Sequence, residues 1–519
     1  MMCSTKFKFS QFFVIILLLL SACHDQLESI APIEDAITEE ESSFNQFNFE
    51  ELADMSDFTN LREGDFTGRF LIISRGQNLP NNLERSIQQA GGELVKTFPQ
   101  IGIAVAVARA EDFLSQAKKI NGIESITPDL ILQYTKEPEI SGEALVFDAS
   151  LTRRGNTASA GAPFNYQDAF FDGVQWAPSS INGPAAWDAG FTGKGVRVAV
   201  IDGGFHSTHQ DLAPNLDIAS SISTVPGFNF NQDVGTFWHG THVAGIVAAA
   251  GNGIVGIAPE ATLIGVKALH GGSGALEWIL EAILYSATPL TEGGAGADII
   301  NMSLGATIDY RNNWGDKGFR DFFKNLQKTY DRATRYAYQN GVTVIASAGN
   351  GGTNYDDAKE FFQLPAQNQH VLSISSTGPT GWVLGNDNFT QPAYYTDHGK
   401  SLVDFAAPGG TIGLFEVEGF DGICTLNGTN LELTRFCELF DMVISCNVNN
   451  NWAWAQGTSM SAPAAAGVAA LIIQANKGKM SPAQVAARMR QSATDLGKSG
   501  QDEFYGHGFV NAAKAVGLN

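Results

Sequence analysis

Near-continuous apolar runs separated by helical segments dominate the chain from about residue 175 onward. Runs of this kind are typical of strands that are buried on both faces, and helices between them indicate a parallel sheet covered on both sides. We therefore predict an α/β fold with a mostly parallel sheet over residues 175–519, with functional residues at the carboxyl ends of its strands. The expected strands span residues 196–201, 261–266, 297–302, 341–346 and 371–375.

A second, shorter pattern of strands and helices precedes this sheet. Its order, β-α-β-β-α-β, predicts a small α+β domain over residues 67–134. The apolar spacing indicates strands at 69–73, 101–107 and 123–126 and helices at 82–90 and 111–120.

The first 22 residues have the pattern of a signal peptide. Lys6 and Lys8 precede an apolar stretch that is too short for a membrane span. The sequence Leu20-Ser21-Ala22-Cys23 resembles the lipobox of bacterial lipoproteins, which implies cleavage before Cys23 and a lipid on that cysteine. The alternative is an ordinary secretory signal that is cut nearby. Either interpretation predicts an exported protein, held in the bacterial cell envelope or secreted.

Composition separates the remaining segments and excludes one class of partner. Residues 23–66 are acidic and lack apolar periodicity, which indicates a solvated tether. Residues 135–174 are rich in small and polar residues and are predicted to be a linker. The net charge of −22 argues against nucleic acid as a partner, because phosphates repel such a surface.

Apart from Cys3 in the signal peptide and Cys23 at its end, the chain has three cysteines: Cys424, Cys437 and Cys446. In an oxidising compartment two of them can pair and leave the third free, and the sequence does not say which two. A zinc site is disfavoured, because there is no closely spaced Cys-x-x-Cys pair.

Three polar residues lie where such a sheet would present them. Asp202 ends an apolar strand, His239 opens a small-residue helix, and Ser459 stands where a loop meets an apolar helix. Ser459 has two interpretations: a serine that caps the helix, or a nucleophile whose oxyanion is stabilised by the helix start. Pro463 is expected in the first turn of that helix.

The stretches Asp202-Gly203-Gly204, His239-Gly240-Thr241-His242 and Gly457-Thr458-Ser459-Met460 resemble the subtilisin-like serine peptidase family (peptidase S8). They stand in the order Asp, His, Ser for which this family is known. The resemblance implies that Ser459 is the nucleophile, His239 the general base, and Asp202 the group that orients it. A zinc pair formed by His239 and His242 is disfavoured, since no Glu lies between them as in the zinc-peptidase helix.

The same resemblance assigns further residues. Asn350, after the strand at 342–346, matches the asparagine that donates a side-chain N–H to the oxyanion. Two stretches resemble the strands that bind an extended peptide between them. Their small or apolar side chains favour an apolar or aromatic residue before the cleaved bond. The residues are Gly272, Ser273 and Gly274 on one side, and Ser303, Leu304 and Gly305 on the other.

The resemblance implies no cofactor for the chemistry, with calcium as a candidate structural ion. Asp211 matches a position that binds calcium in many family members. The partner loop at 250–255 is shorter than in the calcium-binding forms, which counts against that site.

Residues 67–134 resemble the inhibitor I9-like propeptide of this family, which blocks the cleft with its C-terminal tail, here residues 128–134. We hypothesise self-cleavage after Tyr134; the competing site is Arg153-Arg154. A cut at Tyr134 would separate the enzyme from a lipid on Cys23, so the lipid would anchor the precursor to a membrane.

A departure from the family lies at about 411–455, an insertion just before Ser459 that carries the three cysteines. It either shapes the cleft on the far side of the cleaved bond or is a stabilised surface loop. Two functions follow from the sequence. The favoured one is an exported serine endopeptidase that acts on proteins or peptides and on its own propeptide; the alternative is a catalytically silent relative that binds peptides.

Overall fold

The computed structural model describes residues 65–135, 165–232, 238–310, 314–315, 317–478 and 480–518. All of them belong to one compact unit, Ala53–Asn519. The predicted signal peptide, Cys23, the acidic tether before residue 65, most of the linker and the Arg153-Arg154 pair lie outside the described residues. Below, residues 65–135 are called the small domain and residues 165–518 the large domain.

The large domain is built on a seven-stranded sheet with the strand order β14-β13-β11-β9-β5-β7-β6. All the strand pairs in it are parallel, as the apolar runs of the sequence predict. The strands are β5 (Arg197–Asp202), β6 (Ile222–Ser223), β7 (Thr262–Lys267), β9 (Ile299–Met302), β11 (Thr343–Ser347), β13 (Val371–Thr377) and β14 (Phe405–Pro408).

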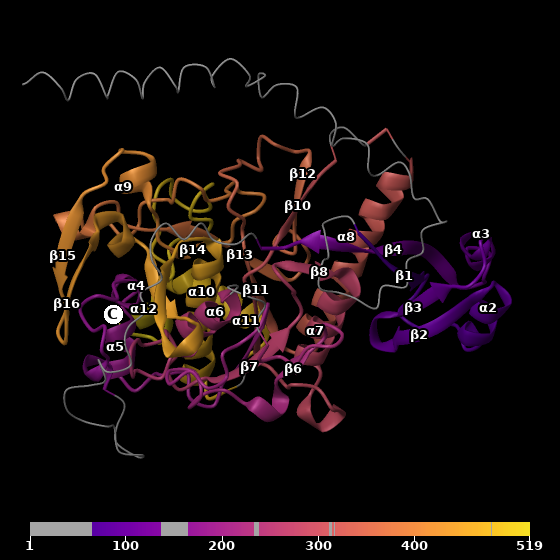
Figure 1. The fold of residues 1–519 in the computed structure, drawn as a ribbon, viewed down its shortest axis with the longest axis horizontal. Helices are drawn as coiled ribbons and strands as arrows, with labels where there is room; N and C mark the ends of the chain where they lie inside the picture. Colours follow the sequence, from indigo (N-terminus) through magenta and orange to yellow (C-terminus); the bar gives the residue numbers. More distant parts are fainter. Residues whose placement is uncertain are drawn as a thin grey trace, which may run out of the picture. The chain divides into compact units, whose positions relative to one another are not determined.

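Helices cover both faces of this sheet (Figure 1). Alternate side chains of β5 enter different cores: Val198 and Val200 pack with α6 and α10, whereas Ala199 and Ile201 pack with α7 and α8. This alternation is the two-residue period of a strand that is buried on both faces. The long helices are α6 (His239–Ala248), α7 (Leu276–Ala287), α8 (Lys317–Gln339), α10 (Thr458–Ala475) and α11 (Pro482–Ser492); the short ones are α4 (Ala177–Ser180), α5 (Gly183–Asp188) and α12 (Ala512–Ala515).

Helix α10 is the apolar helix that Ser459 was expected to open. Among the described residues it is the one helix long and apolar enough to cross a membrane, and 83% of it is buried inside the large domain. The position of Pro463 was predicted wrongly. Because the helix begins at Thr458, Pro463 lies in its second turn, not in its first.

The small domain has the expected order of elements, arranged as an antiparallel sheet with two helices. Strand β4 is longer than the predicted 123–126, because its second half finds a partner in β8 (Ser273–Ala275) of the large domain. In Figure 1, β4 leaves the indigo sheet toward β8 and lies against α8. The elements are β1 (Phe66–Ser74), α2 (Leu83–Gln89), β2 (Gly92–Phe98), β3 (Ile103–Ala108), α3 (Phe113–Ala117) and β4 (Ile123–Gln133).

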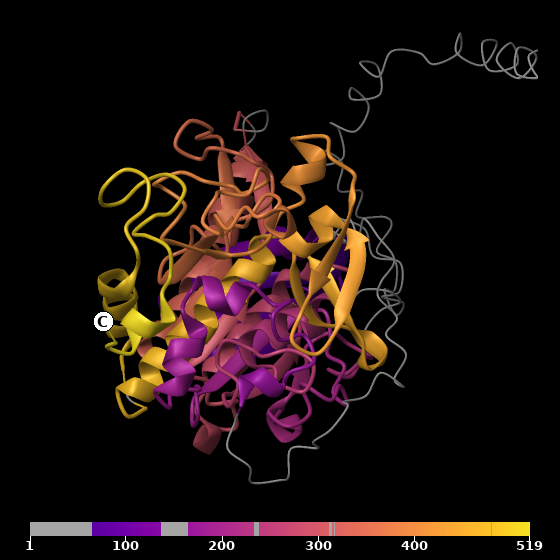
Figure 2. The same ribbon diagram turned by 90° about the vertical axis from the view of Figure 1, so that its left-hand side faces the viewer.

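The insertion forms two antiparallel hairpins after a short helix. The first hairpin is mostly exposed and is closed by a disulfide between Cys424 and Cys437; Cys446 is free and buried. Figure 2 shows these orange strands beside the magenta start of the large domain, where the N–H of Thr429 donates to the carbonyl of Asp172 at 2.8 Å. The elements are α9 (Gly413–Glu416), β15 (Ile423–Asn427), β16 (Glu432–Phe436), β17 (Val443–Cys446) and β18 (Trp452–Ala455); two further short strands, β10 (Ala306–Asp309) and β12 (Phe361–Leu364), pair elsewhere.

The second hairpin of the insertion is part of the core. Strands β17 and β18 are buried throughout and pack on α6, the helix that begins at His239. The hydroxyl of Ser445 donates to the carbonyl of His242 at 2.7 Å. The insertion is therefore more than a surface loop, since half of it covers a helix of the site.

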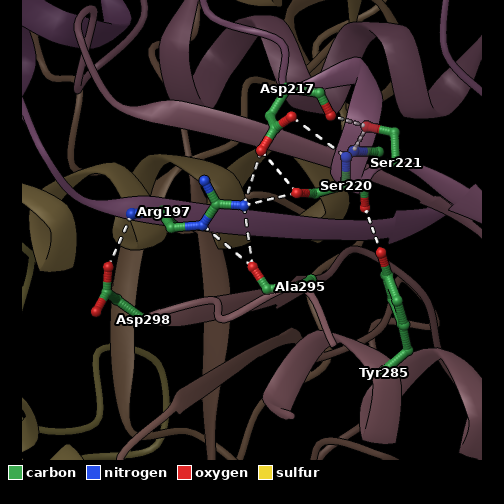
Figure 3. Close-up of polar contacts among 8 residues, drawn as sticks. Arg197, Asp217, Ser220, Ser221, Tyr285, Ala295 and Asp298 are labelled. Atoms are coloured by element: carbon green, nitrogen blue, oxygen red, sulfur yellow. Dashed lines mark hydrogen bonds and ion pairs between the residues drawn. The ribbon is translucent and has the colours of Figure 1, made fainter. Parts of the chain in front are cut away.

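A polar network holds the amino end of β5 (Figure 3). The guanidinium of Arg197 donates to the carboxylate of Asp217 at 2.9 Å, to the hydroxyl of Ser220 at 3.0 Å and to the carbonyl of Ala295. These bonds tie two loops to the strand at the end opposite Asp202. The strand that carries Asp202 is thus fixed at its amino end.

Candidate active site

The first pair of the site is an aspartate and a histidine that face each other at the carboxyl end of β5. The Nδ1–H of His239 donates to Oδ2 of Asp202 at 2.9 Å, and its distance to Oδ1 is 3.0 Å. Asp202 is fully buried, and His239 is 3% exposed. A carboxylate held on Nδ1 leaves the lone pair of Nε2 to accept a proton.

Local sequence explains how these two side chains meet. A β-carbon on Gly240 would collide with the carbonyl oxygen of Gly204 and would lie 3.0 Å from Cβ of Asp202. Only glycine lets the first turn of α6 approach the loop after β5 so closely. Gly203 adds an N–H that donates to Oδ1 of Asp202 at 2.7 Å.

Ser459 is the second residue of α10, and Gly457 caps this helix without a side-chain hydrogen bond. The interpretation of Ser459 as the capping serine is therefore wrong. Gly457 has φ 148° and ψ 157°, a conformation that favours glycine, and it turns the chain into the helix. Ser459 consequently places its side chain and its backbone N–H at the positive end of a buried helix.

Pro463 has a role that the sequence alone did not reveal. It lacks an N–H, so it cannot donate to the carbonyl of Ser459 four residues earlier. That carbonyl instead accepts from the hydroxyl of Ser303 at 2.7 Å, and the Ser459 hydroxyl donates to the carbonyl of Ser303 at 3.2 Å. The nucleophile candidate and a predicted substrate-binding residue are thus joined twice.

Asn350 lies beside the same helix start. Its Oδ1 accepts from the N–H of Thr458 at 2.9 Å and from the hydroxyl of Thr458 at 2.8 Å. These two bonds orient the amide so that its NH₂ group is left to donate. Asn350 is exposed, so this donor is open to a ligand. The arrangement suits a donor for an oxyanion that forms near Ser459.

The predicted peptide-binding stretches hold the tail of the small domain. β4 pairs with β8 in an antiparallel register that places Leu132 opposite Gly274 and Gln133 opposite Ser273. On the other side, the N–H of Gly305 donates to the carbonyl of Tyr134 at 2.9 Å. The structure therefore seats residues 131–135 between the two stretches as an added strand.

The hypothesis of self-cleavage after Tyr134 does not fit the way this tail is bound. The carbonyl of Tyr134 accepts from Gly305, whereas the Ser459 hydroxyl contacts Ser303, two residues away. Two residues of extended chain span about 6.8 Å. In this register the carbonyl of Tyr134 therefore does not face Ser459.

Asp211 was a candidate calcium ligand, and its surroundings indicate a different role. Both carboxylate oxygens accept N–H groups, from the backbone of residues 252–254 and from the indole of Trp452 at 2.8 Å. The short loop thus supplies hydrogen-bond donors where a calcium site supplies oxygen ligands. Burial raises the pKa of Asp211, and these N–H groups partly oppose the rise. We therefore correct the calcium expectation at this position.

Asp211 also lies within a buried group with His209 and Cys446 whose ligand atoms are within 4.8 Å of one another. Both nitrogens of His209 are engaged, because Nε2 donates to the carbonyl of Asn451 at 2.8 Å and Nδ1 accepts from the N–H of Asp211 at 3.1 Å. Burial raises the pKa of the Cys446 thiol, which keeps it protonated. The His209 ring and the Asp211 carboxylate are occupied by other hydrogen-bond partners and the thiol is protonated, so the three do not offer a set of free metal ligands.

His242, the second histidine of α6, is structural. Burial lowers its pKa to about 3, so the ring is neutral, and Nε2 donates to the carbonyl of Ala453 at 3.1 Å. This bond ties α6 to β18 of the insertion. His242 therefore supports the helix of His239 from behind and does not form a metal pair with it.

Lys267 is a residue of the site that the sequence analysis missed. It lies opposite Asp202 in the pairing of β5 with β7 and is fully buried. Its ammonium donates to the carbonyl of Gly203 and, at 2.8 Å, to that of Leu269. A single lysine at the end of an apolar run was the only signal in the sequence. Its charge fixes the loop that carries Asp202.

The comparison with known families agrees with this geometry. The model of the subtilase family matches residues 193–508, which include Asp202, His239, Asn350 and Ser459. The chain belongs to the subtilase family.

Several subtilases resemble this chain over most of the large domain. It is 31% identical to subtilisin BL of Lederbergia lenta over 346 residues, which are 66% of this chain and 98% of that protein. It is 30% identical to thermitase of Thermoactinomyces vulgaris over 357 residues, or 67% of this chain and 98% of that one. The minor extracellular protease Epr of Bacillus subtilis is 32% identical, but the match spans only 41% of its length. These relatives support a serine endopeptidase.

A solved structure extends the likeness of the fold. The crystal structure of the epidermin leader peptide processing serine protease of Staphylococcus aureus, as an S393A mutant, superposes with a TM-score of 0.63. The match covers 88% of this chain and all of that one, at 20% identity. At this identity the likeness shows the subtilisin-like fold alone.

Proposed function

We propose that this subtilase is an exported serine endopeptidase that cuts peptide bonds through an acyl-enzyme on Ser459. The observation that carries the proposal is the hydrogen bond of His239 to Asp202 at 2.9 Å, in a chain that also places Ser459 and Asn350 at one helix start. Each group has the chemistry its position requires: a base, its orienting carboxylate, a hydroxyl and an oxyanion donor.

The chemistry follows from these groups. The Ser459 hydroxyl turns from the carbonyl of Ser303 to His239, and Nε2 takes its proton as Oγ attacks the substrate carbonyl. The N–H of Ser459 and the NH₂ of Asn350 hold the oxyanion. His239 then gives the proton to the leaving amine. In the second half of the reaction a water molecule takes the place of the amine: His239 removes its proton as it attacks the acyl group, and then returns a proton to Oγ of Ser459. Asp202 stabilises the imidazolium throughout.

The reaction needs no cofactor, since the four groups supply every proton and charge that the steps require. The residues beside the cleaved bond favour a large apolar or aromatic side chain, because Ser303, Leu304 and Gly305 offer no charge. Proteins and peptides are the substrates, and nucleic acid is not a partner.

The small domain acts as an I9-like propeptide in this proposal. Support comes from its tail, which occupies the cleft between Gly272–Gly274 and Gly305 as a substrate strand would. The protein is therefore made as a precursor that processes itself, with the cut beyond Thr135. A lipid on Cys23 would then anchor the precursor to the membrane, and processing would release the enzyme.

Processing and proteolysis can be tested together. The Ser459→Ala protein should accumulate as the full precursor and should not degrade casein, whereas the wild-type protein should lose its small domain and degrade casein. N-terminal sequencing of the active form locates the cut. If Ser459→Ala matures and degrades casein like the wild type, the chain does not act through Ser459; if neither form degrades any substrate, the alternative of a silent peptide-binding relative holds.

A further inference from the structure

A pair of buried phenols joins the tail to the large domain. The hydroxyl of Tyr330, on α8, donates to the hydroxyl of Tyr134 at 2.7 Å. Tyr330 is fully buried and Tyr134 is 3% exposed. Burial raises the pKa of both phenols, so both remain neutral and the contact is one hydrogen bond between uncharged groups.

The surroundings of this hydrogen bond are apolar. Both tyrosines belong to the core on the α7 and α8 side of the sheet, together with Leu304, Leu276 and Ile279. A buried hydroxyl that loses its partner in such surroundings is disfavoured by about an order of magnitude or more in an equilibrium constant. When the small domain leaves, Tyr330 loses the partner that Tyr134 provides.

The main chain around Tyr134 is bound as a substrate main chain would be. Its N–H donates to the carbonyl of Gly272 at 3.0 Å, and its carbonyl accepts from Gly305 at 2.9 Å. These are backbone contacts that any extended peptide can repeat, whatever its sequence. A peptide bound in this register therefore places one side chain where Tyr134 lies now.

We infer that Tyr330 is a specificity-determining residue, whose hydroxyl selects a tyrosine of the substrate at the position that Tyr134 occupies. The inference rests on the proposed function, because it concerns peptides that Ser459 cuts. The selected position is not the one directly before the cleaved bond, since the carbonyl of Tyr134 bonds Gly305 and the Ser459 hydroxyl contacts Ser303. It lies further toward the N-terminus of the substrate.

The hydrogen bond makes this position different from a purely apolar pocket. A phenylalanine would fill the same ring space but would leave the hydroxyl of Tyr330 without its partner. An apolar pocket distinguishes such rings weakly, whereas a pocket with a buried donor rejects the side chain that cannot pair. The expected preference is tyrosine over phenylalanine by about tenfold in kcat/KM.

The test uses mature enzyme that has been processed from the full chain. The substrates are internally quenched peptides with the sequence of residues 129–142, carrying Tyr, Phe or Leu at position 134, and mass spectrometry locates the cut. Wild-type enzyme should prefer the Tyr peptide to the Phe peptide by about tenfold. The Tyr330→Phe enzyme should no longer prefer the Tyr peptide, because the hydroxyl of that peptide then has no partner, and KM for the Tyr peptide should rise with kcat less changed.

A matched variant separates this role from a general effect on α8. Tyr338 lies on the same helix and stacks on His370, and Tyr338→Phe should keep the wild-type preference. The inference is overturned if Tyr330→Phe keeps the wild-type ratio of Tyr to Phe, or if wild-type enzyme cuts the three peptides equally or not at all while degrading casein. Enzyme that degrades neither casein nor peptides would instead overturn the proposed function.

Discussion

Two segments contact the large domain in different ways: the small domain, through its tail, an apolar surface and a cluster of charges, and the second hairpin of the insertion, through a buried neutral core. At the small domain, Glu277 of α7 meets Arg69 at 2.8 Å and Lys96 at 3.0 Å, and Asp129 accepts from the N–H of Glu277 at 3.1 Å. At the insertion, buried strands pack directly on α6 and His242 remains neutral.

This difference indicates which of the two segments can dissociate from the large domain. The small domain adds ion pairs to an apolar contact, and charges regain hydration when they separate, so its docking responds to pH and salt. The second hairpin buries apolar surface and neutral hydrogen bonds and is joined to the enzyme by the chain on both sides, so it is a permanent part of the enzyme. The first contact suits a removable inhibitor, and the second suits a support for His239.

The largest effect is expected where the insertion meets α6. A β-carbon on Gly245 would collide with the hydroxyl of Ser445 and would lie 2.7 Å from Sγ of Cys446. Gly245→Val should therefore lower the free energy of unfolding by about 1–3 kcal/mol or more and abolish most activity, because it pushes β17 from the helix of His239. Thermal unfolding and casein hydrolysis measure both. Gly315→Ala, with no atom within 4 Å of the added carbon, is the control, and equal behaviour of the two variants would refute this role of the insertion.

The second prediction concerns pH and the small domain. Burial, with a further contribution from the charge of Glu277, raises the pKa of Asp129 from 3.8 to about 7. In the docked state Asp129 therefore keeps its proton up to about pH 7, whereas the released domain loses it near 3.8. Docking is then favoured most at low pH and weakens as pH rises between these values.

The release of the processed small domain measures this dependence. Between pH 5 and pH 8 its dissociation constant from mature enzyme that has been inactivated at Ser459 with a phosphonate should rise by up to about a hundredfold. Asp129→Asn, which carries no titrating proton, should show a nearly flat profile over the same range. A wild-type profile that is equally flat, or one that tightens with pH, would contradict the role of Asp129.

A smaller effect is expected from Glu277, the carboxylate that pairs with two cations of the small domain. Glu277→Gln removes the carboxylate that holds Arg69 and Lys96, and active enzyme should appear about tenfold faster after processing. The effect is limited because both cations are about one-third exposed. Glu281→Gln is the matched control, since Glu281 pairs with Lys96 at the surface and should change the rate less. Equal rates for the two variants would mean that the buried carboxylate has no special part in docking.

Much of this structure can be predicted from the sequence, because the patterns that predict it are local. The apolar runs predict the parallel sheet, and Asp202, His239, Ser459 and Asn350 each follow a strand or open a helix, so the topology directs them toward the same edge of the sheet.

What the sequence could not show depends on partners far along the chain. Asp211 resembles a calcium ligand until the N–H groups of a short loop and Trp452 are seen around it. Tyr134 was expected to mark the cut, but it forms a hydrogen bond with Tyr330, which is 196 residues away in the sequence. Lys267 gave almost no signal, because a buried charge is understood only through the carbonyls that surround it.

The role of Ser459 as an activated nucleophile is tested most directly by mapping a fluorophosphonate adduct on the mature enzyme. A phosphonate reacts with a serine that is activated by a base and an oxyanion site, so it reports Ser459, His239 and Asn350 together. We expect one adduct on Ser459, lost in Ser459→Ala and kept in Ser461→Ala, whose serine lies two residues along the same helix. Labelling that persists in Ser459→Ala, or an adduct on another residue, would contradict this role of Ser459.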